Sequence, residues 1–138
     1  MKASNVGQDQ TIQELLSKVK TIAVVGLSSQ PAKPAHYVPA YLQAHGYRII
    51  PVNPNLTQVL GEKAYPDLAS VPEPVDLVLL FRPSQEVYSF VESAIQIGTG
   101  AVWMQLGIAD DKAAVLARNA GLEVVMDACM LVEHKRYL

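Results

Sequence analysis

The segment TIAVVGLSS, residues 21–29, decides the fold. Its first five residues are apolar or β-branched, which is typical of a strand buried on both faces in a parallel sheet. Gly26 then ends the strand, and the chain continues towards a helical pattern over residues 35–45 that closes at Gly46. A buried strand, a glycine and a helix in this order predict the first βα unit of an α/β sheet.

Four more short apolar segments follow this first strand. They are residues 48–52, 75–81, 101–104 and 123–126. Helical patterns lie between them over residues 84–97 and 110–120, whereas residues 65–71 predict an irregular crossover with a single helical turn. The alternation predicts a single-domain α/β fold: a Rossmann-like, doubly wound, mostly parallel five-stranded sheet with helices on both faces.

The chain before the first strand is expected to form an amphipathic helix over residues 11–20. Thr11 and Glu14 make the T-x-x-E pattern of a capping box, and apolar residues follow at helical spacing. Residues 1–10 are predicted to be a flexible tail, and residues 11–138 the domain. In the second helix, Pro39 has no N–H, so regular helix is expected to begin near His36.

The composition excludes several classes of protein. Half of the 138 residues are hydrophobic and 17% are charged, with eleven Lys and Arg against thirteen Asp and Glu. This balance is typical of a globular domain and lacks the cationic excess that nucleic-acid binding requires. No apolar run approaches the roughly 20 residues of a membrane span. Cys129 is the only cysteine, so no intrachain disulfide can form and a cytoplasmic location is expected.

The functional site is expected where the strands end. In open α/β sheets, ligands bind outside the carboxyl ends of the strands, at the point where the strand order reverses. Gly26 lets the backbone approach a ligand, and the helix N-terminus that follows, with Lys33 before it, favours an anion such as phosphate. The loop lacks two of the three glycines of G-x-G-x-x-G, so the standard dinucleotide fingerprint is absent. A turn without a ligand stays the alternative.

Two further strand ends carry candidate binding side chains. Asn53 stands where an NAD-binding domain places Asp or Glu, so the position tolerates a nucleotide with an additional phosphate; an Asn-Pro turn is the alternative. Arg82 suits a phosphate, and Phe81 could pack on an adenine ring. A surface salt bridge is the alternative role of Arg82.

The sequence predicts no catalytic residue and no metal site. The three histidines fall at a loop–helix junction, a helix end and the tail. No sequence pattern indicates that any of them pairs with Cys129 or a serine as the base of a catalytic triad. No H-x-x-x-H or C-x-x-C spacing is present. Cys129 lies at the expected binding edge, either as a buried inert thiol or as a group that meets a ligand thiol.

The motifs in this order resemble the small single-domain CoA-binding proteins, whose fold is similar to the CoA-binding domain of the succinyl-CoA synthetase alpha subunit. The resemblance covers nearly the whole chain from Thr11 onward. Its principal segments are VGLSSQPAKP at 25–34, IPVNP at 50–54, FRP at 81–83, VWMQLGI at 102–108 and DAC at 127–129. The synthetase's separate phosphohistidine domain has no counterpart here, so its ligase chemistry is not expected.

The resemblance implies a cytoplasmic protein that binds coenzyme A or an acyl-CoA without catalysis of its own, and it leaves protein partners unknown. An NAD(P)-dependent oxidoreductase and a regulatory interaction domain with a vestigial nucleotide pocket are the alternatives. The first three strand ends are implied to hold the nucleotide and diphosphate, and the fourth to approach the pantetheine. The implied binding residues are Gly26, Leu27, Ser28, Lys33, Pro34, Asn53, Pro54, Phe81, Arg82, Pro83, Gln105, Gly107 and Ile108.

Overall fold

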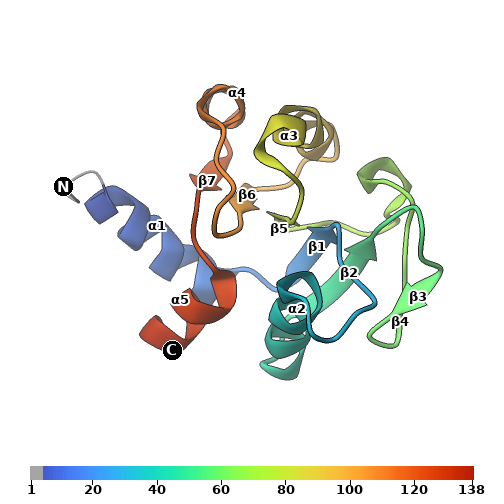
Figure 1. Ribbon diagram of the computed structural model, residues 1–138. Helices are drawn as coiled ribbons and strands as arrows, with labels where there is room; N and C mark the ends of the chain where they lie inside the picture. The colour runs from blue at the N-terminus through green and yellow to red at the C-terminus, as the bar shows by residue number, and fades with distance from the viewer. Residues whose placement is uncertain (1–4) are drawn as a thin grey trace.

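The computed structural model describes residues 5–138 and shows one parallel sheet between two layers of helices (Figure 1). The five strands are β1 (Thr21–Val25), β2 (Arg48–Val52), β5 (Leu77–Leu80), β6 (Ala101–Met104) and β7 (Glu123–Val125). Their order across the sheet is β2-β1-β5-β6-β7, and every neighbouring pair is parallel. The predicted Rossmann-like, doubly wound α/β fold is therefore confirmed.

Helices cover both faces of the sheet (Figure 1). One face carries α1 (Asn5–Lys18), α2 (Pro34–Ala44) and α5 (Met130–Tyr137), and the other carries α3 (Val87–Gln96) and α4 (Asp111–Asn119). Each face has its own apolar core, because the strands between them are buried on both sides. No helix among residues 5–138 has the length and apolarity needed to cross a bilayer.

The first helix begins at Asn5, six residues before the predicted start at Thr11. Residues 1–4 of the expected tail lie outside the described residues, and residues 5–10 are the first turns of α1. Thr11 is not a cap, since its hydroxyl donates to the Gly7 carbonyl within the helix. The Gln8 side chain exchanges two hydrogen bonds, both 3.0 Å long, with the backbone of Met126 beside the edge strand β7. This tertiary pairing holds the early turns against the sheet.

The crossover from β2 to β5 contains a small hairpin that the sequence did not predict. Its strands are β3 (Gln58–Val59) and β4 (Glu62–Lys63), joined by Leu60 and Gly61, which both have positive φ angles. A leucine in this conformation is uncommon, so the two-residue turn lacked its usual Asn-Gly signal. The single helical turn that was predicted for this crossover is present as a 3₁₀ turn at Leu68–Ser70.

Other boundaries differ by a few residues from the prediction. The third predicted strand, residues 75–81, is shortened at both ends to β5, and just before its start the Asp76 carboxylate accepts from the backbone N–H groups of Lys20 and Thr21. The helix predicted over residues 84–97 begins as a 3₁₀ turn and becomes α3 at Val87. The C-terminal segment forms a further helix, α5, from Met130.

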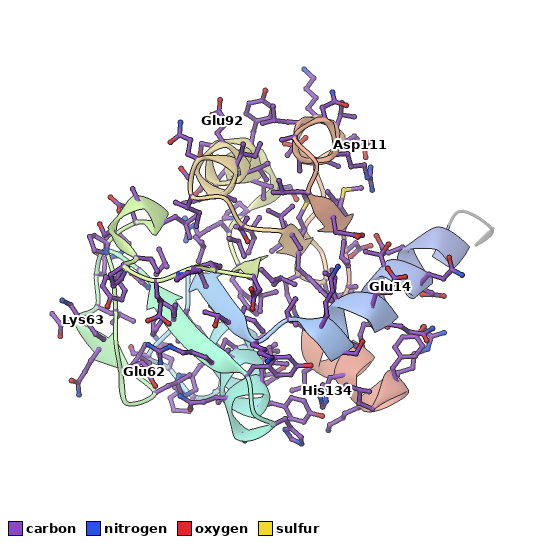
Figure 2. The ribbon with its side chains drawn as sticks, turned by 180° about the vertical axis from the view of Figure 1, so that it is seen from behind. Glu14, Glu62, Lys63, Glu92, Asp111 and His134 are labelled. Carbon is purple, nitrogen blue, oxygen red and sulfur yellow. The ribbon has the colours of Figure 1, made fainter. Side chains whose placement is uncertain are left out.

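An aromatic cluster joins α5 to α2. His134 lies on α5 on the side that faces α2 (Figure 2), and its Nδ1 is 2.8 Å from the Tyr41 hydroxyl. The rings of His45 and Tyr47 pack edge-on against it. Burial, followed by the charge of His45, lowers the pKa of His134 from its ordinary value of 6.5.

The lowered pKa of His134 predicts a loss of stability in mild acid. The contribution of neutral His134 to the free energy of unfolding is fully present above the unfolded-state pKa and is lost as the pH drops through about 6.5. The reason is that His134 then takes up a proton in the unfolded chain, whereas its surroundings in the folded protein disfavour the protonated form. His134→Gln keeps a polar partner for the Tyr41 hydroxyl without titrating. Its urea midpoint should therefore change less than that of the wild type between about pH 7.5 and about pH 5.5. Equal changes in the two proteins would contradict this assignment.

Candidate ligand-binding site

The strand order reverses between β1 and β5. From β1 the chain moves to β2 on one side, whereas from β5 it continues to β6 and β7 on the other. The connections that leave the carboxyl ends of β1 and β5 therefore run apart and leave a crevice between them. Open α/β sheets bind their ligands at this position.

Gly26 lies at this crevice with a φ of +86°. A Cβ atom there would come within 2.8 Å of the Phe81 backbone oxygen, and the Gly26 N–H donates to the Val52 carbonyl at 2.9 Å. Only glycine combines the left-handed backbone with so close an approach to a neighbouring chain. The loop after β1 is thus fixed against the ends of both adjacent strands.

Pro39 contributes a backbone bond that holds this loop. It is the sixth residue of α2, which begins at Pro34, so the prediction that regular helix starts near His36 is wrong. Because proline has no N–H, the Ala35 carbonyl lacks its helical donor and accepts from the Ser28 N–H at 3.0 Å. The interrupted helix therefore binds the loop that precedes it.

Two side chains hold the carbonyl groups of the same loop. Asn53 Nδ2 donates to the Leu27 carbonyl at 2.9 Å, while its Oδ1 accepts from the Asn55 N–H at 2.8 Å. His36 Nδ1 lies 2.7 Å from the Ser28 carbonyl oxygen. Both ends of the Asn53 amide are engaged within the protein, so this side chain positions the loop.

Two pockets flank the loop at the carboxyl edge of the sheet. The Asn53 pocket has a volume of about 330 Å³ and is lined by Val25, Gly26, Val52, Asn53, Pro54, Asn55, Pro66, Arg82, Glu86 and Phe90. The Cys129 pocket has a volume of about 430 Å³ and is lined by Lys33, Pro34, Ala35, Tyr37, Phe81, Arg82, Pro83, Gln105, Leu106, Ile108 and Cys129. Their volumes lie at the lower end of the range for small-molecule sites.

Two larger hollows lie elsewhere on the surface. One, of about 720 Å³, is bordered by the first turns of α1 and by β7, and the other, of about 760 Å³, lies over α3 and α4. Neither includes the loop after β1 or the reversal of the strand order. Topology therefore identifies the candidate site better than volume does.

Arg82 lines both pockets. Its Nη2 and Nε atoms donate to Glu86 Oε1 at 3.0 and 3.1 Å, so the salt bridge considered as its alternative role is present. Both side chains are partly exposed, and an exposed pair of this kind contributes little stability. An anionic ligand can therefore compete with Glu86 for the guanidinium while the fold stays intact.

The end of β6 supplies one pocket residue and one supporting residue. Gln105 is only 4% exposed, lines the Cys129 pocket, and accepts through Oε1 from the Met130 N–H at 3.3 Å. Gly107 lines neither pocket, and its N–H donates to Asp127 Oδ1 at 2.7 Å. Gly107 therefore joins the loops that follow β6 and β7.

The two pockets bring together most of the residues implied by the sequence. These are Gly26, Lys33, Pro34, Asn53, Pro54, Phe81, Arg82, Pro83, Gln105 and Ile108. Leu27, Ser28 and Gly107 line neither pocket; Leu27 is fully buried and Ser28 is bonded to α2. Phe81 lines the Cys129 pocket, so the aromatic ring in the Asn53 pocket belongs to Phe90.

Sequence reasoning missed several pocket residues, of which four have large or charged side chains. Tyr37 and Leu106 border the Cys129 pocket, and Glu86 and Phe90 border the Asn53 pocket. The spacing of four residues between Arg82 and Glu86 was the one signal that could have indicated a pair. Within the described residues, no group of three His, Cys, Asp or Glu side chains is arranged to hold a metal ion.

Comparisons with known proteins place these pockets within one family model. The model, described as "CoA binding domain", matches residues 20–135 and spans every residue that lines the two pockets. The chain is similar to the uncharacterized protein YneT of Bacillus subtilis (strain 168), with 37% identity over 123 residues, 89% of this chain and 91% of that protein. It is also similar to the ADP-forming acetate–CoA ligase II of Archaeoglobus fulgidus, with 32% identity over 108 residues, 75% of this chain but 16% of that protein.

Solved structures show the same architecture. The chain is similar to a hypothetical protein from Pyrococcus horikoshii OT3, with a TM-score of 0.90 and 40% identity over 94% of this chain and 91% of that one. It is similar to a protein from Thermus thermophilus, with a TM-score of 0.89 and 41% identity over 94% of this chain and 98% of that one. The fold therefore recurs as a small chain of nearly the same length.

Proposed function

Because the chain belongs to the CoA-binding domain family, we propose that it binds coenzyme A or an acyl-CoA across the Asn53 and Cys129 pockets, without catalysis of its own. The position of Arg82 carries the proposal, since one guanidinium borders both pockets at the reversal of the strand order. This arrangement suits a ligand with an anionic centre between a nucleotide and a less polar arm. Coenzyme A joins an adenosine phosphate to a pantetheine chain through a diphosphate.

The Asn53 pocket fits the nucleotide end. Pro54, Pro66 and Phe90 give it apolar surfaces against which a base can pack. Gly26 lines this pocket with backbone atoms alone, so a phosphate can approach the loop closely. Arg82 lies beside that wall and supplies charge-assisted hydrogen bonds to the phosphates.

The Cys129 pocket fits the pantetheine arm. Tyr37, Phe81, Leu106 and Ile108 give it mainly apolar walls, and Gln105 adds an amide for polar contacts with the arm. Lys33 borders the same pocket at the start of α2. Together with Arg82 it supplies two cations near the expected diphosphate, against the single carboxylate of Glu86.

Calorimetric titration tests the function. We expect coenzyme A to bind roughly tenfold or more tightly than NAD or NADP, because only coenzyme A has a pantetheine arm to bury in the Cys129 pocket, and a factor of ten requires about 1.4 kcal/mol, less than the burial of one large apolar side chain contributes. NADP is the matched control, since it also carries a diphosphate and an additional ribose phosphate but has no pantetheine. Native mass spectrometry of protein purified without added ligand gives a second measurement.

Three results would contradict the proposal. Tighter binding of NAD or NADP, with coenzyme A unable to displace it, would favour an oxidoreductase. Binding of none of the three would favour an interaction domain with a vestigial pocket. Equal binding of coenzyme A and NADP would show that the Cys129 pocket does not hold the pantetheine arm.

A further inference from the structure

Cys129 is the only cysteine of the chain, and it lines the pocket proposed for the pantetheine arm. It lies between β7 and α5, immediately before the first helical residue, Met130. The side chain is partly exposed and forms no disulfide. Since pantetheine ends in a thiol, the proposed ligand would bring a second sulfur into a pocket that already holds one.

Gln105 gives an independent sign that this pocket takes a polar ligand. The residue is 4% exposed, and its Oε1 is used by the Met130 N–H. Among the hydrogen bonds formed by residues 5–138, none engages its Nε2, although the side chain lines the pocket. This free donor on a nearly buried residue is suited to a ligand acceptor in the pocket, such as an amide or thioester carbonyl.

We propose that Cys129 captures coenzyme A as a reversible mixed disulfide, an inference that rests on the proposed function. The Cys129 thiolate attacks one sulfur of a CoA disulfide, the S–S bond of that disulfide breaks, and a Cys129–CoA disulfide forms. The released CoA thiolate takes up the proton that Cys129 lost. The Cys129 sulfur is oxidised and the released CoA sulfur is reduced, so no further oxidant is needed.

The pocket accounts for selectivity in this exchange. A CoA disulfide held by Arg82 and Gln105 presents its sulfur at an effective concentration in the millimolar range, whereas a disulfide without the nucleotide reaches Cys129 only by collision. The fraction of protein in the mixed-disulfide form then follows the ratio of CoA disulfide to CoA thiol. The site thereby reports the oxidation state of its own ligand.

Intact-mass spectrometry tests the proposal with two probes. At about 10 μM of each, CoA disulfide should modify the folded protein about 100-fold faster than oxidised glutathione does. The product should be heavier by one coenzyme A less two hydrogen atoms, and Cys129→Ser should give no such product. In urea the two probes should react at similar rates, because unfolding removes the pocket and leaves the thiol.

A matched variant separates the pocket from the thiol. Gln105→Glu keeps the acceptor for the Met130 N–H but removes the free donor, so adduct formation should slow by about fivefold or more, and urea denaturation of the variant checks that it is folded. Adenosine 3′,5′-bisphosphate should also slow the reaction, since it competes for the nucleotide site alone. Unchanged rates in both experiments would overturn the proposal.

Failure of the mixed-disulfide proposal can be distinguished from failure of the proposed CoA-binding function. Calorimetry of the wild-type protein under reducing conditions reports non-covalent CoA binding alone. If coenzyme A binds there but CoA disulfide reacts no faster than oxidised glutathione, the mixed disulfide is wrong and the CoA site stands. If coenzyme A does not bind, the proposed function itself is wrong.

Discussion

Gly26→Ala is expected to weaken CoA binding by roughly 30-fold or more, equivalent to about 2 kcal/mol, and to lower the free energy of unfolding by about 2–4 kcal/mol. The new Cβ would lie 2.8 Å from the Phe81 backbone oxygen and 3.1 Å from Arg82 Cδ, in a backbone with a φ of +86°. The loop must move to relieve the contact. That movement strains the bonds from Gly26 to Val52 and from Asn53 to Leu27.

Gly121→Ala is the matched control. Gly121 has a φ of +88°, but a Cβ there would meet no atom within 4 Å. It should therefore lose only the stability due to backbone strain, about 1–2 kcal/mol, and keep its affinity for coenzyme A. Urea denaturation and calorimetric titration measure the two quantities. Equal losses of stability in both variants, or unchanged CoA affinity in Gly26→Ala, would show that the close approach to Phe81 does not position the loop.

The sheet was predictable because its strands are buried on both faces. Such strands are continuous apolar segments, and glycine or proline ends them, so β1, β2 and β6 have the predicted bounds to within a residue. The reversal of strand order also follows from the rules of α/β connections. These two facts placed the site at the strand ends before any side-chain contact was known.

The errors in the fold arise where long-range contacts decide local structure. Residues 5–10 lack an apolar periodicity, and their helix depends on the pairing of Gln8 with Met126, which is 118 positions away. Pro39 lies in the interior of α2 because Ser28 uses the carbonyl that it leaves free. Helical periodicity and capping patterns contain neither piece of information.

Side-chain partners were the least predictable part of the site. The sequence placed Asn53 at the correct strand end, but it could not show that both ends of the amide bind the loop. It likewise offered phosphate binding and a salt bridge as alternatives for Arg82, whereas the structure has the salt bridge beside both pockets. The hydrogen-bond partner that each of these side chains takes depends on the distances between helices and strands, and packing sets those distances.

Removing the Arg82 guanidinium is expected to weaken CoA binding by about 10–100-fold, because a charge-assisted hydrogen bond contributes about 1.5–3 kcal/mol. The side chain is partly exposed and its ion pair is weak, so Arg82→Ala should stay folded. Glu86→Gln should act in the opposite direction and strengthen CoA binding several-fold, since the carboxylate that competes for the guanidinium is gone. Added salt should reduce both effects.

Titrations with coenzyme A and dephospho-CoA identify the phosphate that Arg82 contacts. If the guanidinium binds the 3′-phosphate, Arg82→Ala should lose less affinity for dephospho-CoA than for coenzyme A; equal losses place it on the diphosphate. The double variant Arg82→Ala/Glu86→Gln tests the coupling, because the gain from Glu86→Gln should shrink when its partner is absent. Unchanged CoA affinity in Arg82→Ala would mean that the salt bridge with Glu86 is the whole role of Arg82, and the ligand would have to lie away from the reversal of the strand order.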